Sequence, residues 1–193
     1  RLDANGAWSV AEAVEFAKRL SGYNIDFLEQ PCETIEELAD LKSELQAHSL
    51  NIKIAADASI RKADDPMRAA QSQVADILIL KNQPLGGIAK VLELAEAANV
   101  PAVISSALES SVGISMSAYL AAALPDLKYA CGLGTASMLQ ADVTDEPLIP
   151  RDGKIPVRRV NVSAEKLAEF SSTEERKRWW LERLKRCYEI LTN

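Results

Sequence analysis

Four ionisable residues each end a short apolar run, and these strand-end residues are Asp3, Glu29, Asp57 and Lys81. Their runs read RLD, IDFLE, IKIAAD and DILILK, and they recur every 24 to 28 residues, the length of one strand plus one helix. Ionisable side chains normally avoid the buried ends of parallel strands. Their repetition therefore indicates a shared site, most simply one that binds a cation.

The three strand-end acids favour a particular kind of cation. Carboxylates from adjacent strands, with no His or Cys beside them, supply the hard oxygen ligands that suit Mg2+ or Mn2+ rather than zinc. Without a cation, three converging carboxylates would repel one another and at least one would tend to hold a proton. The alternative is that each acid caps a helix or pairs with a lysine. The common register of three acids and one lysine favours the metal site.

Lys81 and the segment SSALESS, residues 105–111, extend the candidate site. Burial and a neighbouring cation both favour the neutral amine, so a strand-end lysine can act as base, acid or electrostatic stabiliser. Its alternative role is an ion pair with Asp57 or Glu29. Ser105, Ser106 and nearby N–H groups could hold a carboxylate or phosphate at a helix N-terminus. Ordinary N-capping by Ser110 remains open beside that role.

Helical patterns separate the strand-like runs. Two of them open with capping-box pairs, Ser9 with Glu12 and Thr34 with Glu37. Helices are expected over residues 9–20, 34–46, 64–73, 88–98 and 110–124.

Six strand-like segments alternate with these helices, the last over residues 127–131. Such alternation, with runs that are apolar on both faces, indicates a parallel sheet covered by helices. An open doubly wound sheet gathers ligands at one switch point, whereas a closed barrel takes functional residues from the ends of many successive strands. Because the strand-end residues come from successive strands, we expect an α/β barrel.

The C-terminal part departs from this alternation. We expect a partial barrel with the metal site over residues 1–143 and an extension over residues 144–193. Asp152-Gly153 predicts a hairpin turn, and an amphipathic helix is expected from Ser172. This helix is expected to pack on the barrel or on a capping region, and Trp179 and Trp180 would bury apolar area there.

Composition excludes several classes of function. With 48% hydrophobic residues the chain can form a sizeable core, and its net charge of -6 argues against binding of nucleic acid. No apolar stretch is long enough to span a membrane. Its three cysteines are widely spaced, which fits a reducing cytoplasm better than a disulfide framework. The chain begins at Arg1 on a strand-like run, so we expect an upstream portion to be missing.

Five ordered motifs, RLDANGAW, FLEQPC, IAADASIRKADDP, ILKNQPLGG and SSALESSVG, resemble the enolase superfamily. Within it, they are more closely similar to the o-succinylbenzoate synthase family, over residues 1 to about 143. The resemblance implies a TIM-type fold, strands three to eight of a modified (β/α)7β barrel. The first strands and an N-terminal capping domain would then be absent from this chain.

The resemblance also implies a reaction, the dehydration of a succinyl-hydroxycyclohexadiene carboxylate to o-succinylbenzoate in menaquinone biosynthesis, through a metal-stabilised enediolate. Asp3, Glu29 and Asp57 would bind Mg2+, with Mn2+ as a possible substitute, and Lys81 would stabilise the intermediate electrostatically. The remaining implied site residues hold the succinyl carboxylate, namely Ser105 and Ser106, or line the pocket, namely Gly132 and Gly134.

Two departures from the family pattern stand out. The family's acid/base lysine lies in a K-x-K motif on the second strand, and this chain has no K-x-K. Ala58 replaces the Glu that usually follows the third metal ligand, which weakens support around the metal. We therefore expect a lyase fragment, inactive alone, whose partners are a small carboxylate substrate and a missing N-terminal segment or complementary chain. The alternatives are an N-succinylamino acid racemase or epimerase, or a non-catalytic half-barrel that acts as an assembly partner.

Overall fold

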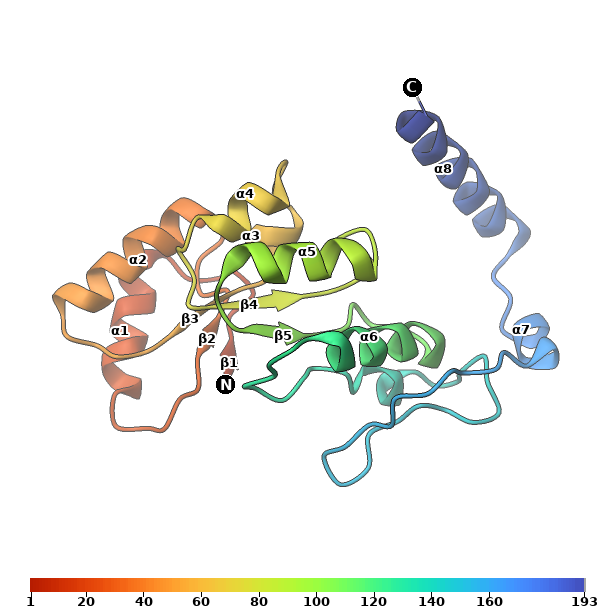
Figure 1. Cartoon of the computed structure of the whole chain (residues 1–193), viewed down its shortest axis with the longest axis horizontal. Helices are drawn as coiled ribbons and strands as arrows, with labels where there is room; N and C mark the ends of the chain where they lie inside the picture. Colours follow the sequence, from red (N-terminus) through yellow and green to blue (C-terminus); the bar gives the residue numbers. More distant parts are fainter. Residues whose placement is uncertain (193) are drawn as a thin grey trace.

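A computed structural model describes residues 1–192, in which parallel strands alternate with helices (Figure 1). The strands are β1 (Leu2–Asp3), β2 (Leu28–Glu29), β3 (Ile54–Ala56), β4 (Ile77–Leu80) and β5 (Ala102–Ile104). The helices are α1 (Val10–Leu20), α2 (Ile35–Ala47), α3 (Ala58–Arg61), α4 (Pro66–Gln71), α5 (Ile88–Ala98), α6 (Ser111–Ala123), α7 (Ala164–Glu169) and α8 (Glu174–Thr192), with a 3-10 turn, η1 (Thr135–Met138).

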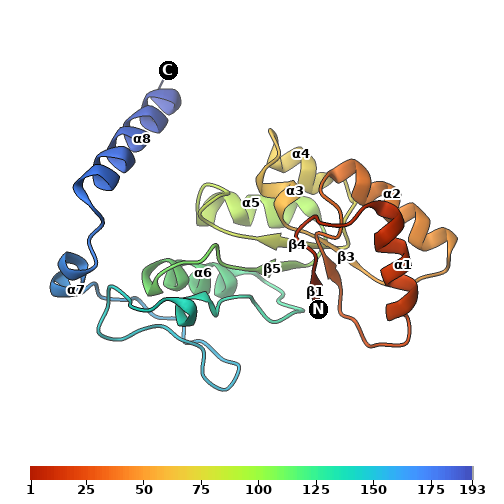
Figure 2. The same cartoon turned by 180° about the vertical axis from the view of Figure 1, so that it is seen from behind.

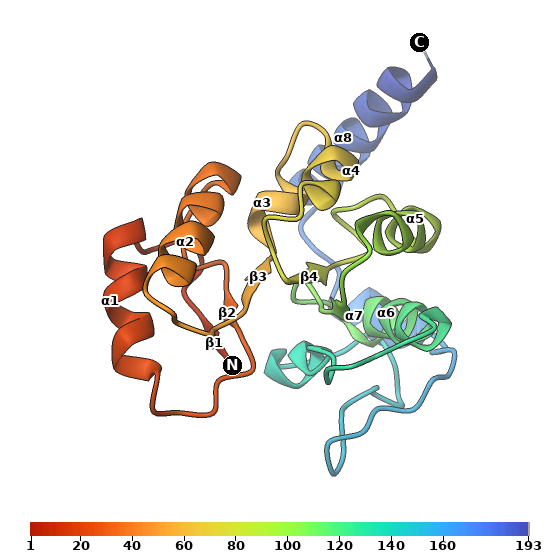
Figure 3. The same ribbon diagram turned by 60° about the vertical axis from the view of Figure 1, so that its left-hand side comes forward.

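The sheet has the strand order of a barrel segment. Its five strands are parallel and lie side by side in sequence order, from β1 to β5, with no reversal of the kind that marks a doubly wound sheet. Figure 3 shows α1 to α6 in an arc around these strands. The expected barrel architecture is therefore confirmed as a partial (β/α) barrel.

Two apolar clusters cover the two faces of the sheet. Helices α1, α2, α4, α5 and α6 contribute to the larger cluster, and the strand residues that join them are Ile54, Ala56, Leu78, Leu80, Ala102 and Ile104. The smaller cluster contains Phe27, Ala55, Ile77, Ile79 and Val103, with Tyr129 packed against it. Because the side chains of a strand alternate between faces, this smaller cluster fills the concave interior.

The chain following α6 does not form the regular sixth strand expected over residues 127–131. In the part of the chain described, only a single parallel bridge, between Ser105 and Gly132, continues the sheet beyond β5. The Gly132 N–H donates to the Ile104 carbonyl at 2.8 Å, and the Ser106 N–H donates to the Gly132 carbonyl at 3.2 Å. Glycines weaken a strand, since they contribute no side chain to its packing.

Side-chain caps mark the starts of α1, α2, α4 and α7. Both predicted capping boxes are confirmed, Ser9 with Glu12 at the start of α1 and Thr34 with Glu37 at the start of α2. The short helix α3, which directly follows Asp57, is an element that the sequence patterns did not predict.

Residues 144–160 run back along α6. The Ser115 hydroxyl donates to the Arg158 carbonyl at 2.6 Å, and the Leu148 N–H donates to the Ser111 hydroxyl at 2.7 Å. The predicted hairpin turn is confirmed, because Arg151 and Lys154 exchange two backbone hydrogen bonds across Asp152-Gly153. A domain boundary at residue 143 stays a prediction.

The C-terminal helix α8 projects away from the sheet (Figures 1 and 2). It has no buried residue, so it does not pack on the barrel in this structure, and its expected packing on a capping region stays a prediction. Trp179 and Trp180 are 40% and 51% exposed, and they contact each other edge to face. The helix begins at Glu174, two residues after the expected start at Ser172, and the Thr173 hydroxyl accepts from the Arg176 N–H. Among residues 1–192, no helix has both the length and the apolar character needed to cross a bilayer.

Candidate active site

The strand-end residues share the concave side of the sheet. Glu29, Asp57 and Lys81 each follow a residue of the interior cluster by two positions, these residues being Phe27, Ala55 and Ile79. A strand places residues i and i+2 on the same face, so the three ionisable side chains start from the interior face where β2, β3 and β4 end. The C-terminal ends of barrel strands are the usual place of active sites in this architecture.

Asp57 and Lys81 form a buried ion pair. The Lys81 Nζ lies 2.6 Å from the Asp57 Oδ2, and their side chains are only 14% and 5% exposed. The Nε of Arg61 lies 3.5 Å from the other carboxylate oxygen, Oδ1. That buried oxygen accepts no hydrogen bond from the described residues. The pairing of Lys81 with Asp57, one of the two alternatives left open by the sequence, is thus present.

Glu29 sits in a negative environment at the end of β2. Burial, the largest cause, and the charges of Asp3 and Asp57 raise the pKa of Glu29 from its usual 4.5 to about 7, although Lys81 and Arg1 act in the opposite direction. A carboxyl group whose pKa is raised by neighbouring carboxylates lacks sufficient positive charge around it. The positively charged side chains near the end of β2 therefore do not balance the negative charge of the carboxylates around Glu29.

Asp3 is the most exposed of the strand-end acids. Its Oδ1 accepts from the Asn5 N–H at 2.8 Å, and its Oδ2 lies 3.2 Å from the Asn5 Nδ2. Cα pairing sets Asp3 directly beside Glu29 on the neighbouring strand. The two carboxylates therefore leave the sheet at the same level.

The three acids do not converge tightly enough to form a preformed metal cage. Among residues 1–192, no group of three or more His, Cys, Asp and Glu side chains has the spacing of a metal site. The residues nevertheless fit a divalent cation in three respects: their oxygens are hard ligands, one buried Asp57 oxygen lacks a hydrogen bond, and Glu29 is held in a surplus of negative charge. The metal set of Asp3, Glu29 and Asp57 stays a prediction.

Gln30 is a residue of the site that sequence reasoning missed. Its side chain is buried, and its Oε1 accepts from the Asp57 N–H at 2.9 Å and from the N–H and hydroxyl of Ser59, both at 3.1 Å. These partners lie 27 and 29 residues away along the chain. Only its position beside a strand-end acid, in the motif FLEQPC, could have drawn attention to it.

The predicted substrate-binding residues gather at the end of β5. The Ser106 hydroxyl donates to the Gly132 carbonyl at 3.0 Å and lies 2.8 Å from the Thr135 hydroxyl. A Cβ on Gly132 would lie 2.8 Å from the Ser105 hydroxyl, so a side chain at residue 132 would require that hydroxyl to move. Gly134 directly precedes the turn η1. Their role in substrate binding stays a prediction.

The N-terminus of α6 has a partner within the chain. Ser110, its N-cap residue, makes no capping hydrogen bond with its side chain, so ordinary capping by Ser110 is wrong. Instead, the Asp142 carboxylate accepts from the Ser111 N–H at 3.0 Å and from the Ser111 hydroxyl at 2.5 Å. One N–H group at this helix N-terminus, where a carboxylate or phosphate of a ligand was expected to bind, is therefore already paired with Asp142.

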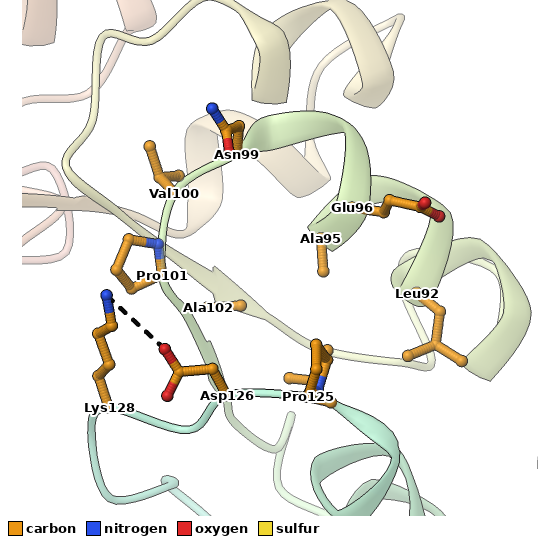
Figure 4. Close-up of a pocket in the computed structure, with 11 residues that line it drawn as sticks. Leu92, Ala95, Glu96, Asn99, Val100, Pro101, Ala102, Pro125, Asp126 and Lys128 are labelled. Carbon is orange, nitrogen blue, oxygen red and sulfur yellow. Dashed lines mark ion pairs between the residues drawn. The ribbon is translucent and has the colours of Figure 1, made fainter.

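A cavity of about 520 Å³ lies at the opposite end of β5 (Figure 4). It is lined by the C-terminal half of α5, the segment entering β5 and the residues after α6, and the ion pair of Asp126 with Lys128 spans 3.6 Å beside it. None of the strand-end residues lines it. The cavity is therefore separate from the candidate active site.

Comparison with known proteins agrees with this architecture. The profile of the enolase C-terminal domain-like family matches residues 1–160. A curated o-succinylbenzoate synthase of Thermobifida fusca is 49% identical over 169 residues, which cover 88% of this chain and 52% of that protein. That of Mycobacterium tuberculosis is 46% identical over 192 residues, 99% of this chain and 57% of that protein. The chain thus spans little more than half the length of these relatives.

Solved structures show the same fold. The muconate lactonizing enzyme of Pseudomonas putida matches with a TM-score of 0.74 and 27% identity, over 87% of this chain and 48% of that one. A dipeptide epimerase of Enterococcus faecalis matches with a TM-score of 0.66 and 28% identity, over 77% of this chain and 43% of that one. From the family profile and the barrel geometry together, the chain belongs to the enolase C-terminal domain-like family.

Proposed function

We propose that this chain supplies the metal-binding part of an o-succinylbenzoate synthase active site. The observation that carries the proposal is the buried contact of 2.6 Å between Lys81 and Asp57. It lies near Glu29, whose pKa is raised by burial and by neighbouring carboxylates. The chain is also 46% and 49% identical to curated synthases. The identity favours this reaction over others of the same fold. The strand ends offer carboxylates suited to binding a cation and a lysine suited to stabilising negative charge, which are two of the groups that the reaction requires.

The proposed reaction is a dehydration. The substrate loses a proton from the carbon beside its carboxylate and a hydroxyl from the adjacent ring carbon, so that water leaves and the ring becomes aromatic. When bound by Asp3, Glu29 and Asp57, Mg2+ or Mn2+ would supply positive charge beside the substrate carboxylate. The positive charge of Lys81 would stabilise the anion that forms on proton loss.

Lys81 has an electrostatic role in this proposal. Its ammonium group, held 2.6 Å from Asp57, presents a positive charge at the interior face of the strand ends. Ser105 and Ser106, at the end of the next strand, would hold the succinyl carboxylate through their hydroxyl groups. Gly132 and Gly134 would leave room for the substrate beside them.

The proton-transfer group is proposed to come from a second polypeptide segment. Among the residues that the structure describes, Lys81 is the only lysine that directly follows a strand, and it is already paired with Asp57. A lysine on a further strand, placed on the opposite side of the substrate, would complete the acid/base set. The partner of this chain is thus a complementary barrel segment, either joined to it or as a separate chain.

A complementation assay tests this function. The chain is mixed with the portion of the Thermobifida fusca synthase that it does not cover, and o-succinylbenzoate is followed by chromatography. We expect product formation only in the mixture and only with Mg2+ or Mn2+. Lys81→Met should abolish product formation, whereas Lys90→Met, which changes an exposed lysine on α5, should not. A mixed complex that forms by size-exclusion chromatography but yields no product would contradict the proposal.

A second candidate, racemisation or epimerisation of an N-acyl amino acid, rests on the structural likeness to the dipeptide epimerase. The segment from Gly132 to Met138 carries no acidic residue that could bind the ammonium group of a dipeptide, so an N-succinylamino acid is the better substrate for this alternative. Incubation of the same mixture with an N-succinylamino acid in deuterium oxide discriminates the two. Deuterium at the α-carbon without synthase turnover would favour the racemase.

A further inference from the structure

Gln30 links the three strand ends that carry the acids. Its backbone N–H donates to the Ala55 carbonyl at 2.8 Å, and its carbonyl accepts from the Gly6 N–H at 2.7 Å. Its side-chain oxygen accepts from the Asp57 N–H at 2.9 Å. One residue therefore joins the loop after β1, the end of β2 and the end of β3.

The side chain of Gln30 uses both ends of its amide. The Oε1 accepts three hydrogen bonds, from the N–H of Asp57 and from the N–H and hydroxyl of Ser59. The Nε2 donates to the carbonyls of Cys32 at 2.9 Å and Glu33 at 3.3 Å. A buried amide is costly unless its polar atoms are paired, and here both of them are. The side chain is only 1% exposed, so these hydrogen bonds are shielded from water.

The backbone at Gln30 adopts a conformation that glutamine rarely takes. Its φ is 39°, in the left-handed region, which a residue with a Cβ enters only when its surroundings hold it there. The five side-chain hydrogen bonds supply that constraint. A residue with a strained backbone and a fully hydrogen-bonded side chain, directly after Glu29, is typical of a functional site whose side chains are held in fixed positions.

From this arrangement we infer that Gln30 is a positioning residue, which fixes Glu29 and Asp57 relative to each other so that both carboxylates can bind one divalent cation. The inference rests on the proposed metal role of Asp57. Ala58, which follows Asp57, offers no polar side chain to support the ligand. Gln30 thus supplies that support from the neighbouring strand, by holding the Asp57 and Ser59 amides.

Titration of Mn2+ into the metal-free chain, followed by electron paramagnetic resonance or calorimetry, tests the inference without requiring turnover. Gln30→Met keeps the length of the side chain and removes all five hydrogen bonds. We expect it to weaken Mn2+ binding by about 10- to 100-fold, the range found when groups that support metal ligands are removed. Ser59→Ala removes only the hydroxyl donor, so a smaller weakening of about two- to fivefold is expected, as for the loss of one hydrogen bond.

Thr34→Ala is the matched control. It removes the capping box of α2, four residues beyond Gln30, and should lower the melting temperature without changing Mn2+ affinity. If Gln30→Met and Ser59→Ala only lowered the melting temperature, as Thr34→Ala does, Gln30 would be a structural residue and the inference would be overturned.

Asp57→Asn separates this inference from the proposed function. If Asp57→Asn abolishes Mn2+ binding and Gln30→Met leaves it unchanged, the metal role of Asp57 stands and only the positioning role of Gln30 fails. If Asp57→Asn leaves the affinity unchanged, the proposed metal site is wrong and the inference falls with it.

Discussion

At the scale of single residues, the strand ends combine one paired charge with one unbalanced charge. Asp57 is neutralised by Lys81 at 2.6 Å, whereas burial and two neighbouring carboxylates raise the pKa of Glu29 to about 7. Such an arrangement is favourable when a cation is bound and less favourable without one. The crowded carboxylates of the candidate site therefore lower the stability of the cation-free fold and favour the binding of a cation.

The raised pKa of Glu29 predicts how stability depends on pH. Between about 4.5 and 7, the folded chain keeps a proton on Glu29 that the unfolded chain has released, so the free energy of unfolding should fall as pH rises through this window and level off above it. Urea denaturation in chelator-treated buffer measures this slope. In Glu29→Gln the slope should be reduced, because the titrating group is gone.

A substitution of another glutamate serves as the control for the pH dependence of the free energy of unfolding. Glu93→Gln changes an exposed glutamate on α5 that pairs with Lys90, and it should leave the slope as in the original chain. An identical slope in the original chain and in Glu29→Gln would show that Glu29 ionises normally in the folded state.

The sequence predicted the strand-end residues but not what connects them. Acids that recur with the length of a strand-helix unit are visible because the spacing itself repeats. Gln30 carries no such signal, since its partners Asp57 and Ser59 lie on another strand and a lone glutamine after a glutamate is ordinary. The pairing of Lys81 with Asp57 does not follow from the sequence, because sequence spacing gives no side-chain direction.

At the scale of elements, short parallel strands and the helices between them set the geometry of the site. Sequence patterns identified β1 to β5 and most helices, because capping boxes and apolar periodicity are local signals. They also predicted a strand at residues 127–131, which the structure does not contain. The chain there joins β5 only through a single bridge at Gly132. Whether a short apolar run pairs as a strand depends on its neighbours in space, which local patterns do not reveal.

Close packing between α6 and the loop after β4 gives a prediction at this scale. A Cβ on Gly113 would lie 2.8 Å from Gln83 Nε2 and from Glu109 Oε2, and 2.9 Å from Glu109 Cβ. Gly113→Ala should therefore destabilise the fold by about 1–3 kcal/mol, despite the better helix propensity of alanine. Thermal or urea unfolding measures the change.

Gly22→Ala serves as its control, because a Cβ at Gly22 would meet no atom within 4 Å. It should leave stability unchanged or slightly increased. Equal stability of the Gly113→Ala and Gly22→Ala variants would mean that α6 can shift to accommodate the methyl group.

At the scale of the whole molecule, the chain consists of a packed partial barrel and a projecting C-terminal helix. Residues 144–160 return along α6, whereas α8 buries no residue. The sequence predicts an amphipathic helix from Ser172, with one apolar face. The sequence does not show which surface, if any, packs against the apolar face of this helix, because the periodicity of one helix contains no information about its partner.

Truncation tests how α8 relates to the barrel. Removal of residues 172–193 should leave the melting temperature of the remaining chain nearly unchanged, because no residue of α8 is buried against it. Differential scanning calorimetry of both chains makes the comparison. A marked drop after truncation would mean that α8 packs on the barrel in solution.

The central claim is that the strand ends form a divalent cation site, and a thermal titration with Mg2+ tests it most directly. We predict that Mg2+ raises the melting temperature of the chain in a concentration-dependent way and that Asp57→Asn removes this rise. Asp65→Asn, which changes the N-cap of α4 to another good capping residue, should respond like the original chain. A melting temperature that is independent of Mg2+, or an equal rise in Asp57→Asn, would contradict the account.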